Sequence, residues 1–251
     1  MQEIADAGEE IGAQEIGSAL RLHISTVFRF LQTLMNNGVV ERNSRNGKYR
    51  LGMKLLDWGM QVLRQMDLRR DALPYLRELR ENTRQTVHMT VYDRGAAIYV
   101  DKIQGTSPLR GFSEIGKAAP LHCTGVGKAL MAGLSPAELS ELLKTYQLRR
   151  FTPNTITNAG ILKKEMERIR VQGYALDNEE HEPGIRCVAA PIRNHTGKVV
   201  ASISIAGRTT DITPRRIPRL IQAVKETAQK IGARLGHGSA ADEEPGSNDG
   251  R

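Results

Sequence analysis

Hydrophobic and polar residues recur with a helical period in the segment HISTVFRFLQTLMNNG, residues 23–38. A helical wheel predicts one broad apolar face formed by Ile24, Val27, Phe28, Phe30, Leu31, Leu34 and Met35. The other face carries Ser25, Thr26, Arg29, Gln32, Thr33 and Asn36. Gly38 follows at a position typical of a helix C-terminus, and the hydroxyls of Ser25 and Thr26 suit either an N-terminal cap or a phosphate contact. The pattern therefore predicts a two-sided helix.

The segments on either side of this helix predict a helix-turn-helix with a wing. Upstream, AQEIGSALRL has apolar residues at helical spacing, and only residues 21–23 separate it from the next helix. Downstream, VVERNSRNGKYRLG predicts a hairpin that turns at Asn46-Gly47, with Val40, Tyr49 and Leu51 available for one buried face. Its basic side chains are expected on or near the exposed loop, at Arg42, Arg45, Lys48 and Arg50.

Further along the chain, the period of the pattern changes. A connecting helix is predicted over residues 54–68, and the segment TVHMTVYD then alternates apolar and polar residues before an Asp93-Arg94-Gly95 turn into AAIYVDKI. A second strand pair is predicted in RCVAAPI and KVVASISIAG, with Ile203 and Ile205 on one side and Ser202, Ser204 and Ala206 on the other. Helices are expected to start at Ser135, Asn158 and Thr213-Pro214.

These elements predict an α+β protein with a central antiparallel sheet flanked by helices. The expected parts are a winged helix-turn-helix over 1–53, a linker helix over 54–68 and a larger domain over 69–236. The last residues, 237–251, are small, polar and acidic, and are predicted to form a disordered tail.

The charge distribution indicates which part of the chain meets a polyanion. The formal net charge is +8, and residues 1–20 contain acids but no Lys or Arg, whereas residues 21–54 contain basic residues against Glu41 alone. Because an α-helix fits the major groove, Arg29 and Gln32 are expected at base edges, while Ser25 and Thr26 bind phosphate. A merely solvated polar face is the alternative. The predicted DNA-contacting residues are Ser25, Thr26, Arg29, Gln32, Thr33, Arg42, Arg45, Lys48 and Arg50.

Cysteine usage and hydropathy favour a cytoplasmic protein. Cys123 and Cys187 show no CxxC spacing, which fits a reducing compartment. The N-terminus has no signal-peptide pattern, and no apolar run approaches the ~20 residues that span a bilayer.

The segment HCTGVGKALMAG, residues 122–133, resembles a phosphate-binding loop but fails its pattern at two positions. A nucleotide loop needs glycine where His122 stands, and Ser or Thr where Ala129 stands. The residues Thr124 to Gly127 instead suit a glycine-rich helix start, whose N–H groups attract a carboxylate. Close helix packing that requires glycine is an equally good explanation.

The acidic segment GYALDNEEHEPGIRCVAAPI, residues 173–192, suits a small-molecule pocket better than a metal site. A zinc site would need His122, Cys123, His181 and Cys187 to converge, and no regular ligand spacing supports this, so neither metal nor cofactor is expected. Asp177, Cys187 and Ser204 could offer polar contacts to a ligand, although Cys187 could also be an ordinary core residue.

Two rival functions remain open at this point. One is an enzyme with Cys187 as nucleophile and His122 or His181 as base. The other is an interaction module that binds no small molecule.

Taken together, five segments resemble the IclR family of bacterial transcriptional regulators across residues 8–236. They are LRLHISTVFRFLQTLMNNGVVERN, YRLG, PLHCTGVGKALMA, TPNTIT and DNEEHEPGIRCVAAPI. The resemblance implies a non-catalytic repressor with a winged helix and a GAF-like or profilin-like effector domain. It also implies a dimer, or a dimer of dimers, on a palindromic operator, and a small organic acid as effector.

The resemblance further implies which residues bind the effector. The Gly125-Val126 backbone would hold the carboxylate, with Asp177, Cys187 and Ser204 as polar contacts. The apolar wall would come from Leu109, Phe112 and Ile115. The chain departs from the family at Ala206, where some members carry a second pocket serine, and at MQEIADAGEE, which is expected to supply only the end of a first helix.

Overall fold

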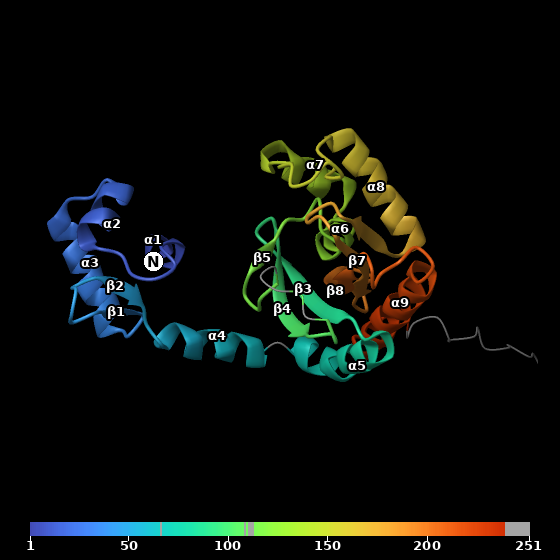
Figure 1. Ribbon diagram of the computed structural model, residues 1–251, viewed down its shortest axis with the longest axis horizontal. Helices are drawn as coiled ribbons and strands as arrows, with labels where there is room; N and C mark the ends of the chain where they lie inside the picture. The colour runs from blue at the N-terminus through green and yellow to red at the C-terminus, as the bar shows by residue number, and fades with distance from the viewer. Residues whose placement is uncertain (66, 108, 110–112, 239–251) are drawn as a thin grey trace, which may run out of the picture. The chain divides into compact units, whose positions relative to one another are not determined.

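The computed structural model describes residues 1–65, 67–107, 109 and 113–238, and the chain divides into two compact units. The first is Met1–Asp67 and the second is Leu68–Arg251 (Figure 1). Residues 239–251, which make up most of the predicted tail, lie outside the described residues. No helix in the described ranges is both long and apolar enough to cross a membrane.

The first unit is a small helical domain with a two-stranded wing. Its elements are α1 (Gln2–Asp6), α2 (Ala13–Leu20), α3 (Ile24–Asn36), β1 (Val40–Arg42), β2 (Tyr49–Leu51) and α4 (Lys54–Gln65). The buried core of the unit consists of Ile4, Ile16, Val27, Leu31, Val40 and Tyr49. The predicted helix-turn-helix and hairpin are confirmed.

The apolar face of α3 is narrower than the sequence pattern predicted. Val27 and Leu31 are buried, whereas Phe28 and Phe30 are 48% and 52% exposed. Residues 27 and 31 are one helical turn apart, while 28 and 30 lie roughly 100° to either side of them, so the broad-face prediction was wrong for both phenylalanines. The helix ends at Asn36, and Gly38 follows with φ +69°, as expected of the glycine predicted to stop it.

The start of α3 is capped by His23 rather than by the predicted hydroxyls. The N-cap side chain accepts a hydrogen bond from the Ser25 backbone N–H at 3.4 Å. In the wing, Val40 and Tyr49 are buried as expected. Leu51, the last residue of β2, is exposed instead, although it pairs across the hairpin with the buried Val40.

The second unit is built on a six-stranded antiparallel sheet in the order β5-β4-β3-β8-β7-β6. Its strands are β3 (Thr86–Asp93), β4 (Ala96–Ile103), β5 (Ala118–Ala119), β6 (Ala175–Asn178), β7 (Ile185–Arg193) and β8 (Val199–Arg208). Its helices are α5 (Asp67–Thr83), α6 (Gly125–Met131), α7 (Pro136–Thr145), α8 (Ala159–Gln172) and α9 (Ile217–Arg234). The predicted α+β class is confirmed.

The helix starts of this unit follow the predicted caps with one exception. Ser135 Oγ accepts from the Glu138 N–H at 3.2 Å, and the Glu138 carboxylate accepts from the Ser135 N–H at 2.7 Å. Asn158 caps α8 with its Oδ1, which accepts from the Ile161 N–H at 3.0 Å. The last helix begins at Ile217 and not at Thr213-Pro214, because a second proline, Pro218, occupies its first turn.

Both faces of the central sheet are covered by helices. In Figure 1, α6, α7 and α8 lie on one side of the sheet, and α5 and α9 on the other. The register pairs His88 with Ser204 and Met89 with Ile203, so polar side chains share the face beneath α6. The alternation read from the sequence therefore separates two buried faces rather than a buried face from a solvated one.

Candidate functional site

The outer face of α3 presents the polar side chains expected to meet DNA. Ser25, Arg29, Gln32 and Thr33 are exposed, and Thr26 is half-buried. Ser25 Oγ lies 2.8 Å from His23 Nδ1, and Gln32 Nε2 donates to Asn36 Oδ1 at 2.9 Å. These bonds run along the helix surface and leave the face open to an outside partner.

The four basic side chains of the wing differ in how they are held. Arg42 donates to the Gly47 carbonyl at 3.2 Å and lies over the Tyr49 ring, and Arg50 pairs with Glu41 at 3.0 Å. Arg45 and Lys48 are exposed and have no ion-pair partner among the described residues.

Glu10 holds the wing turn, a role that the sequence analysis missed. Its carboxylate accepts from Asn43 Nδ2 at 2.9 Å and from Asn46 Nδ2 at 2.7 Å, and it lies 3.9 Å from Arg50. The hydrogen bonds from Asn46 and then Asn43 hold the pKa of Glu10 below its ordinary value. Ile11, the next residue, exchanges backbone hydrogen bonds with Tyr49 at 3.0 and 2.8 Å. Residues 10 and 11 thus fix the wing from outside the hairpin.

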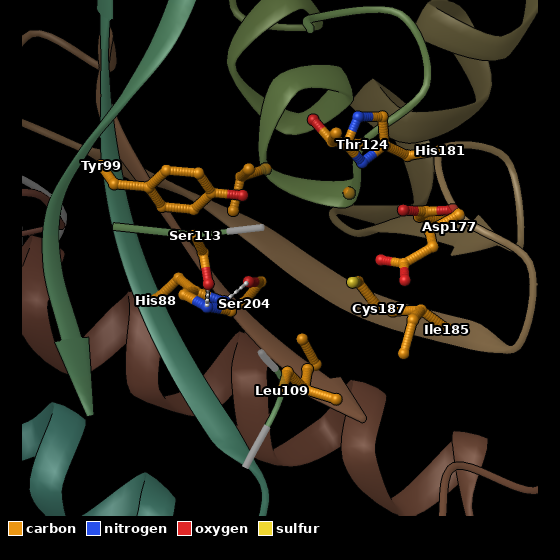
Figure 2. Close-up of a pocket in the computed structure, with 14 residues that line it drawn as sticks. His88, Tyr99, Leu109, Ser113, Thr124, Asp177, His181, Ile185, Cys187 and Ser204 are labelled. Carbon is orange, nitrogen blue, oxygen red and sulfur yellow. Dashed lines mark hydrogen bonds between the residues drawn. The ribbon is translucent and has the colours of Figure 1, made fainter. Parts of the chain in front are cut away.

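A cavity opens in the second unit, between the start of α6 and the polar face of the sheet, and its empty space measures about 500 Å³ with the open mouth included (Figure 2). It brings together six of the predicted effector-binding residues, namely Leu109, Gly125, Val126, Asp177, Cys187 and Ser204. Ala206 also lines it. Phe112 lies outside the described residues, and Ile115 is 45% exposed and does not line the cavity.

The two glycines at the start of α6 differ in their surroundings. Thr124 caps the helix by accepting from the Gly127 N–H at 3.0 Å, and Gly125 and Val126 line the cavity. A Cβ at Gly127 would lie 2.5 Å from the Pro120 carbonyl oxygen and from Leu121 Cα, so this position requires glycine for close packing. Gly125 borders the cavity and also lies close to β7, since its Cβ would be 3.3 Å from Cys187 Cβ, whereas Gly127 serves the packing.

Asp177 is a buried carboxyl at the cavity wall, only 4% exposed. Burial raises the pKa of Asp177 to about 7, and the charge of Glu180 adds to the rise. The Glu180 N–H, which donates to Asp177 Oδ1 at 2.8 Å, and the Lys128 ammonium oppose it. Near neutral pH this carboxyl can therefore act as donor or acceptor toward a ligand.

Burial disfavours the thiolate that a Cys187 nucleophile would need, although His181, one of the two predicted bases, lines the same cavity. Burial raises the pKa of the Cys187 thiol well above its ordinary value, and the Asp177 charge raises it further, which opposes thiolate formation. His122 is engaged elsewhere, with Tyr146 Oη at 3.1 Å and the Arg149 carbonyl at 2.9 Å. Within the described ranges, no three His, Cys, Asp or Glu side chains cluster as metal ligands.

His88 is a cavity residue that the sequence analysis did not select. Its ring nitrogens lie 2.8 Å from Ser113 Oγ and 3.3 Å from Ser204 Oγ, and Figure 2 shows this chain of hydrogen bonds beside Tyr99. Burial lowers the pKa of His88 to about 3, so the ring is neutral. The local pattern gave no signal for it, because the pairing of His88 with Ser204 joins residues 116 positions apart.

Comparison with known proteins places both units in one family. Residues 60–233 match the family described as "Bacterial transcriptional regulator IclR C-terminal", and residues 1–44 match the "IclR helix-turn-helix domain". The HTH-type transcriptional regulator XynR of Escherichia coli strain K12 is 37% identical over 228 residues, which cover 91% of this chain and 90% of XynR.

Solved structures give the same result. The structure of IclR from Thermotoga maritima matches with a TM-score of 0.73 at 36% identity, covering 91% of this chain and 92% of that one. An IclR homologue from Microbacterium hydrocarbonoxydans in complex with 4-hydroxybenzoate shares the fold, with a TM-score of 0.77 at 23% identity and coverage of 91% and 92%.

Proposed function

This chain belongs to the IclR family of bacterial transcriptional regulators, and from that premise we propose that it is a repressor that binds a palindromic operator and responds to a small organic acid. The first unit would bind DNA as part of a dimer or a dimer of dimers. The second unit would bind the effector in the cavity lined by Asp177, Cys187 and Ser204. The observation that carries the proposal is the combination of an exposed polar face on α3 with this partly polar cavity in the same chain.

In the DNA-binding part of the proposal, Arg29 and Gln32 read base edges while Ser25, Thr26 and Thr33 contact phosphate or sugar. The wing would add phosphate contacts through Arg42, Arg45, Lys48 and Arg50. Since phosphate contacts release counterions, operator affinity should fall steeply with salt concentration.

Arg29→Ala is expected to weaken operator binding about 10- to 100-fold and to reduce discrimination against unrelated DNA, because a bidentate base contact contributes about 1–3 kcal/mol. Fluorescence anisotropy with operator and scrambled duplexes measures both effects. Arg219→Ala, which removes the same charge from an exposed position of the second unit, serves as the control. Equal losses on the two duplexes would reassign Arg29 to the backbone, and unchanged binding would remove α3 from the interface.

Glu10→Ala is expected to weaken operator binding several-fold, although it removes a negative charge from a DNA-binding unit. The wing turn would lose its acceptor for Asn43 and Asn46 and would no longer present Arg45 and Lys48 in one position. Electrostatics alone predicts the opposite sign, namely tighter binding. The control is Glu9→Ala, which makes the same charge change at an exposed neighbour, whereas the wing contacts are made by Glu10. Tighter binding by both variants would contradict the positioning role.

In the effector part of the proposal, the carboxylate of the acid lies at the Gly125-Val126 backbone and Asp177 binds another polar group of the ligand. Leu109 and Ile185 would contact its apolar portion. The complex of the Microbacterium homologue with 4-hydroxybenzoate supports an organic acid in this fold. Binding would favour one arrangement of the DNA-binding units over another, because a ligand shifts an equilibrium only by its differential affinity for the two states.

A thermal melting screen tests the effector assignment directly. Keto acids, sugar-derived acids and aromatic acids are added to the full chain, and a true effector should raise the unfolding temperature and alter operator binding at the same concentrations. If no acid of these classes raised it, the alternative of a protein that binds no small molecule would be favoured.

A further inference from the structure

A second recess in the larger unit has a cationic rim. It measures about 540 Å³ and lies outside the cavity described above. Its rim carries Arg170 of α8, Arg193 of β7, Lys225 of α9 and the imidazole of His237. The floor is small and apolar, with contributions from Ala190, Pro191 and Ala228. Among the described residues, no Asp or Glu lines this recess.

The recess exists because the edge strand of the sheet is shorter than its neighbour. β6 pairs with β7 only from Arg186 to Ala189, while β7 continues to Arg193. The C-terminal end of α8 and one side of α9 border the space beyond β6. Gly173, which caps α8 with φ +77°, lies against Lys225, since a Cβ on that glycine would be 3.4 Å from Lys225 Cε.

Each cation on the rim is anchored to backbone carbonyl groups. Lys225 Nζ donates to the Gln172 carbonyl at 2.9 Å, and Arg193 donates to the Gly197 carbonyl at 2.8 Å. Arg170 donates to two carbonyls just after α6, each at 2.8 Å. Cations are favourable at helix C-termini, which explains the positions of Arg170 and Lys225, whereas Arg193 holds the turn between β7 and β8.

These contacts with carbonyl groups do not use all of the hydrogen-bonding capacity of the three cations. Guanidinium and ammonium groups have more N–H donors than these bonds use. None of Arg170, Arg193 and Lys225 has an ion pair with a carboxylate of the described residues. Lys128, the buried cation of the same unit, has Glu165 and Glu180 as partners. The rim therefore lacks the internal counter-charge that the chain supplies elsewhere.

We infer that this recess is a second ligand site, which binds a small anion carrying two or more carboxylate or phosphate groups. The forked donors of Arg170 and Arg193 match the oxygens of either group. Lys225 adds a point charge from the facing helix, and the apolar floor accommodates a short carbon skeleton. The site is independent of the effector cavity and of the acid proposed to bind there.

The test uses citrate and inorganic pyrophosphate as probes on the full chain, at constant ionic strength set with chloride. Calorimetric titration and the unfolding temperature report binding. At least one probe is expected to bind and to raise the unfolding temperature, and the one that binds identifies the preferred oxyanion. The double variant Arg193→Gln/Lys225→Gln should weaken this binding about tenfold or more, because it removes two charge-assisted contacts.

The control is Lys164→Gln/Arg219→Gln, which removes the same charge from exposed positions of the same unit and should bind like the unchanged protein. Glutamine can still donate to the carbonyls, so the fold should persist. If the double variant melts well below the unchanged protein without probe, Arg193→Gln alone replaces it, with a smaller expected loss. The site is overturned if neither probe binds beyond chloride, if the control loses binding equally, or if the rim variant binds normally.

Discussion

Lys128→Met is expected to lower the free energy of unfolding of the second unit by about 3–5 kcal/mol. Lys128 is 1% exposed, and its ammonium lies 2.5 Å from Glu180 and 3.5 Å from Glu165. Without it, Glu180 loses its only ion-pair partner among the described residues, while Glu165 keeps Arg168 at 2.7 Å. The Lys128 charge lowers the pKa of Glu180 against the larger raising effect of burial, so its loss would favour a protonated Glu180.

Urea and thermal unfolding of the full chain measure this loss, with Lys164→Met as the matched control. Lys164 is exposed, so its substitution should change stability by no more than about 0.5 kcal/mol. Lys128→Met combined with Glu180→Gln should recover much of the stability, because replacing both partners leaves no uncompensated charge. Equal effects of Lys128→Met and Lys164→Met would show that the buried pair contributes little.

The consequences of this pair extend to the cavity. Lys128 belongs to α6, the helix that carries Gly125 and Val126, and Glu180 donates its N–H to Asp177. The ion pair therefore connects the two elements that form opposite walls of the cavity. The stability that the ion pair contributes and the geometry of the ligand site depend on the same contact.

The sequence predicted the features that are encoded over short distances along the chain. The helix-turn-helix, the Asn46-Gly47 hairpin and the Ser135 capping box each depend on residues a few positions apart, and all are confirmed. The width of the α3 apolar face was overestimated because Phe28 and Phe30 were counted by residue type, whereas the small core admits only one narrow stripe.

Features that depend on distant pairing could not be predicted from one sequence. Glu10 reaches Asn46 across 36 positions, and His88 reaches Ser204 across 116. The alternation around His88 placed this residue on one face of a strand but gave no sign of what covers that face, and in the structure α6 lies over it. Asp177, Cys187 and Ser204 were selected by residue type and by resemblance, and the β6-β7-β8 pairing explains how they come together.

Asp177→Asn is expected to stabilise the protein at alkaline pH by about 2–4 kcal/mol. The carboxyl has a pKa of about 7 in the folded chain against an ordinary value of 3.8. Between these values the folded state holds a proton that the unfolded state has released, so stability falls as the pH rises from about 4 to about 7. Asparagine does not ionise, and its Oδ1 can still accept from the Glu180 N–H, so the variant avoids that fall.

Thermal unfolding from pH 4 to pH 8 should therefore give one stability curve for Asp177→Asn and one for the unchanged protein, which meet at low pH and separate as the pH rises. Effector binding distinguishes a functional carboxyl from a structural one. An ionised Asp177 repels an organic acid, so affinity in the unchanged protein should rise as the pH falls through about 7, after the ligand's own titration is subtracted. Asp177→Asn should bind with little pH dependence, whereas Asp177→Ala should lose the contact and the operator response together. If the stability difference between Asp177→Asn and the unchanged protein stayed constant from pH 4 to pH 8, Asp177 would ionise normally in the folded chain.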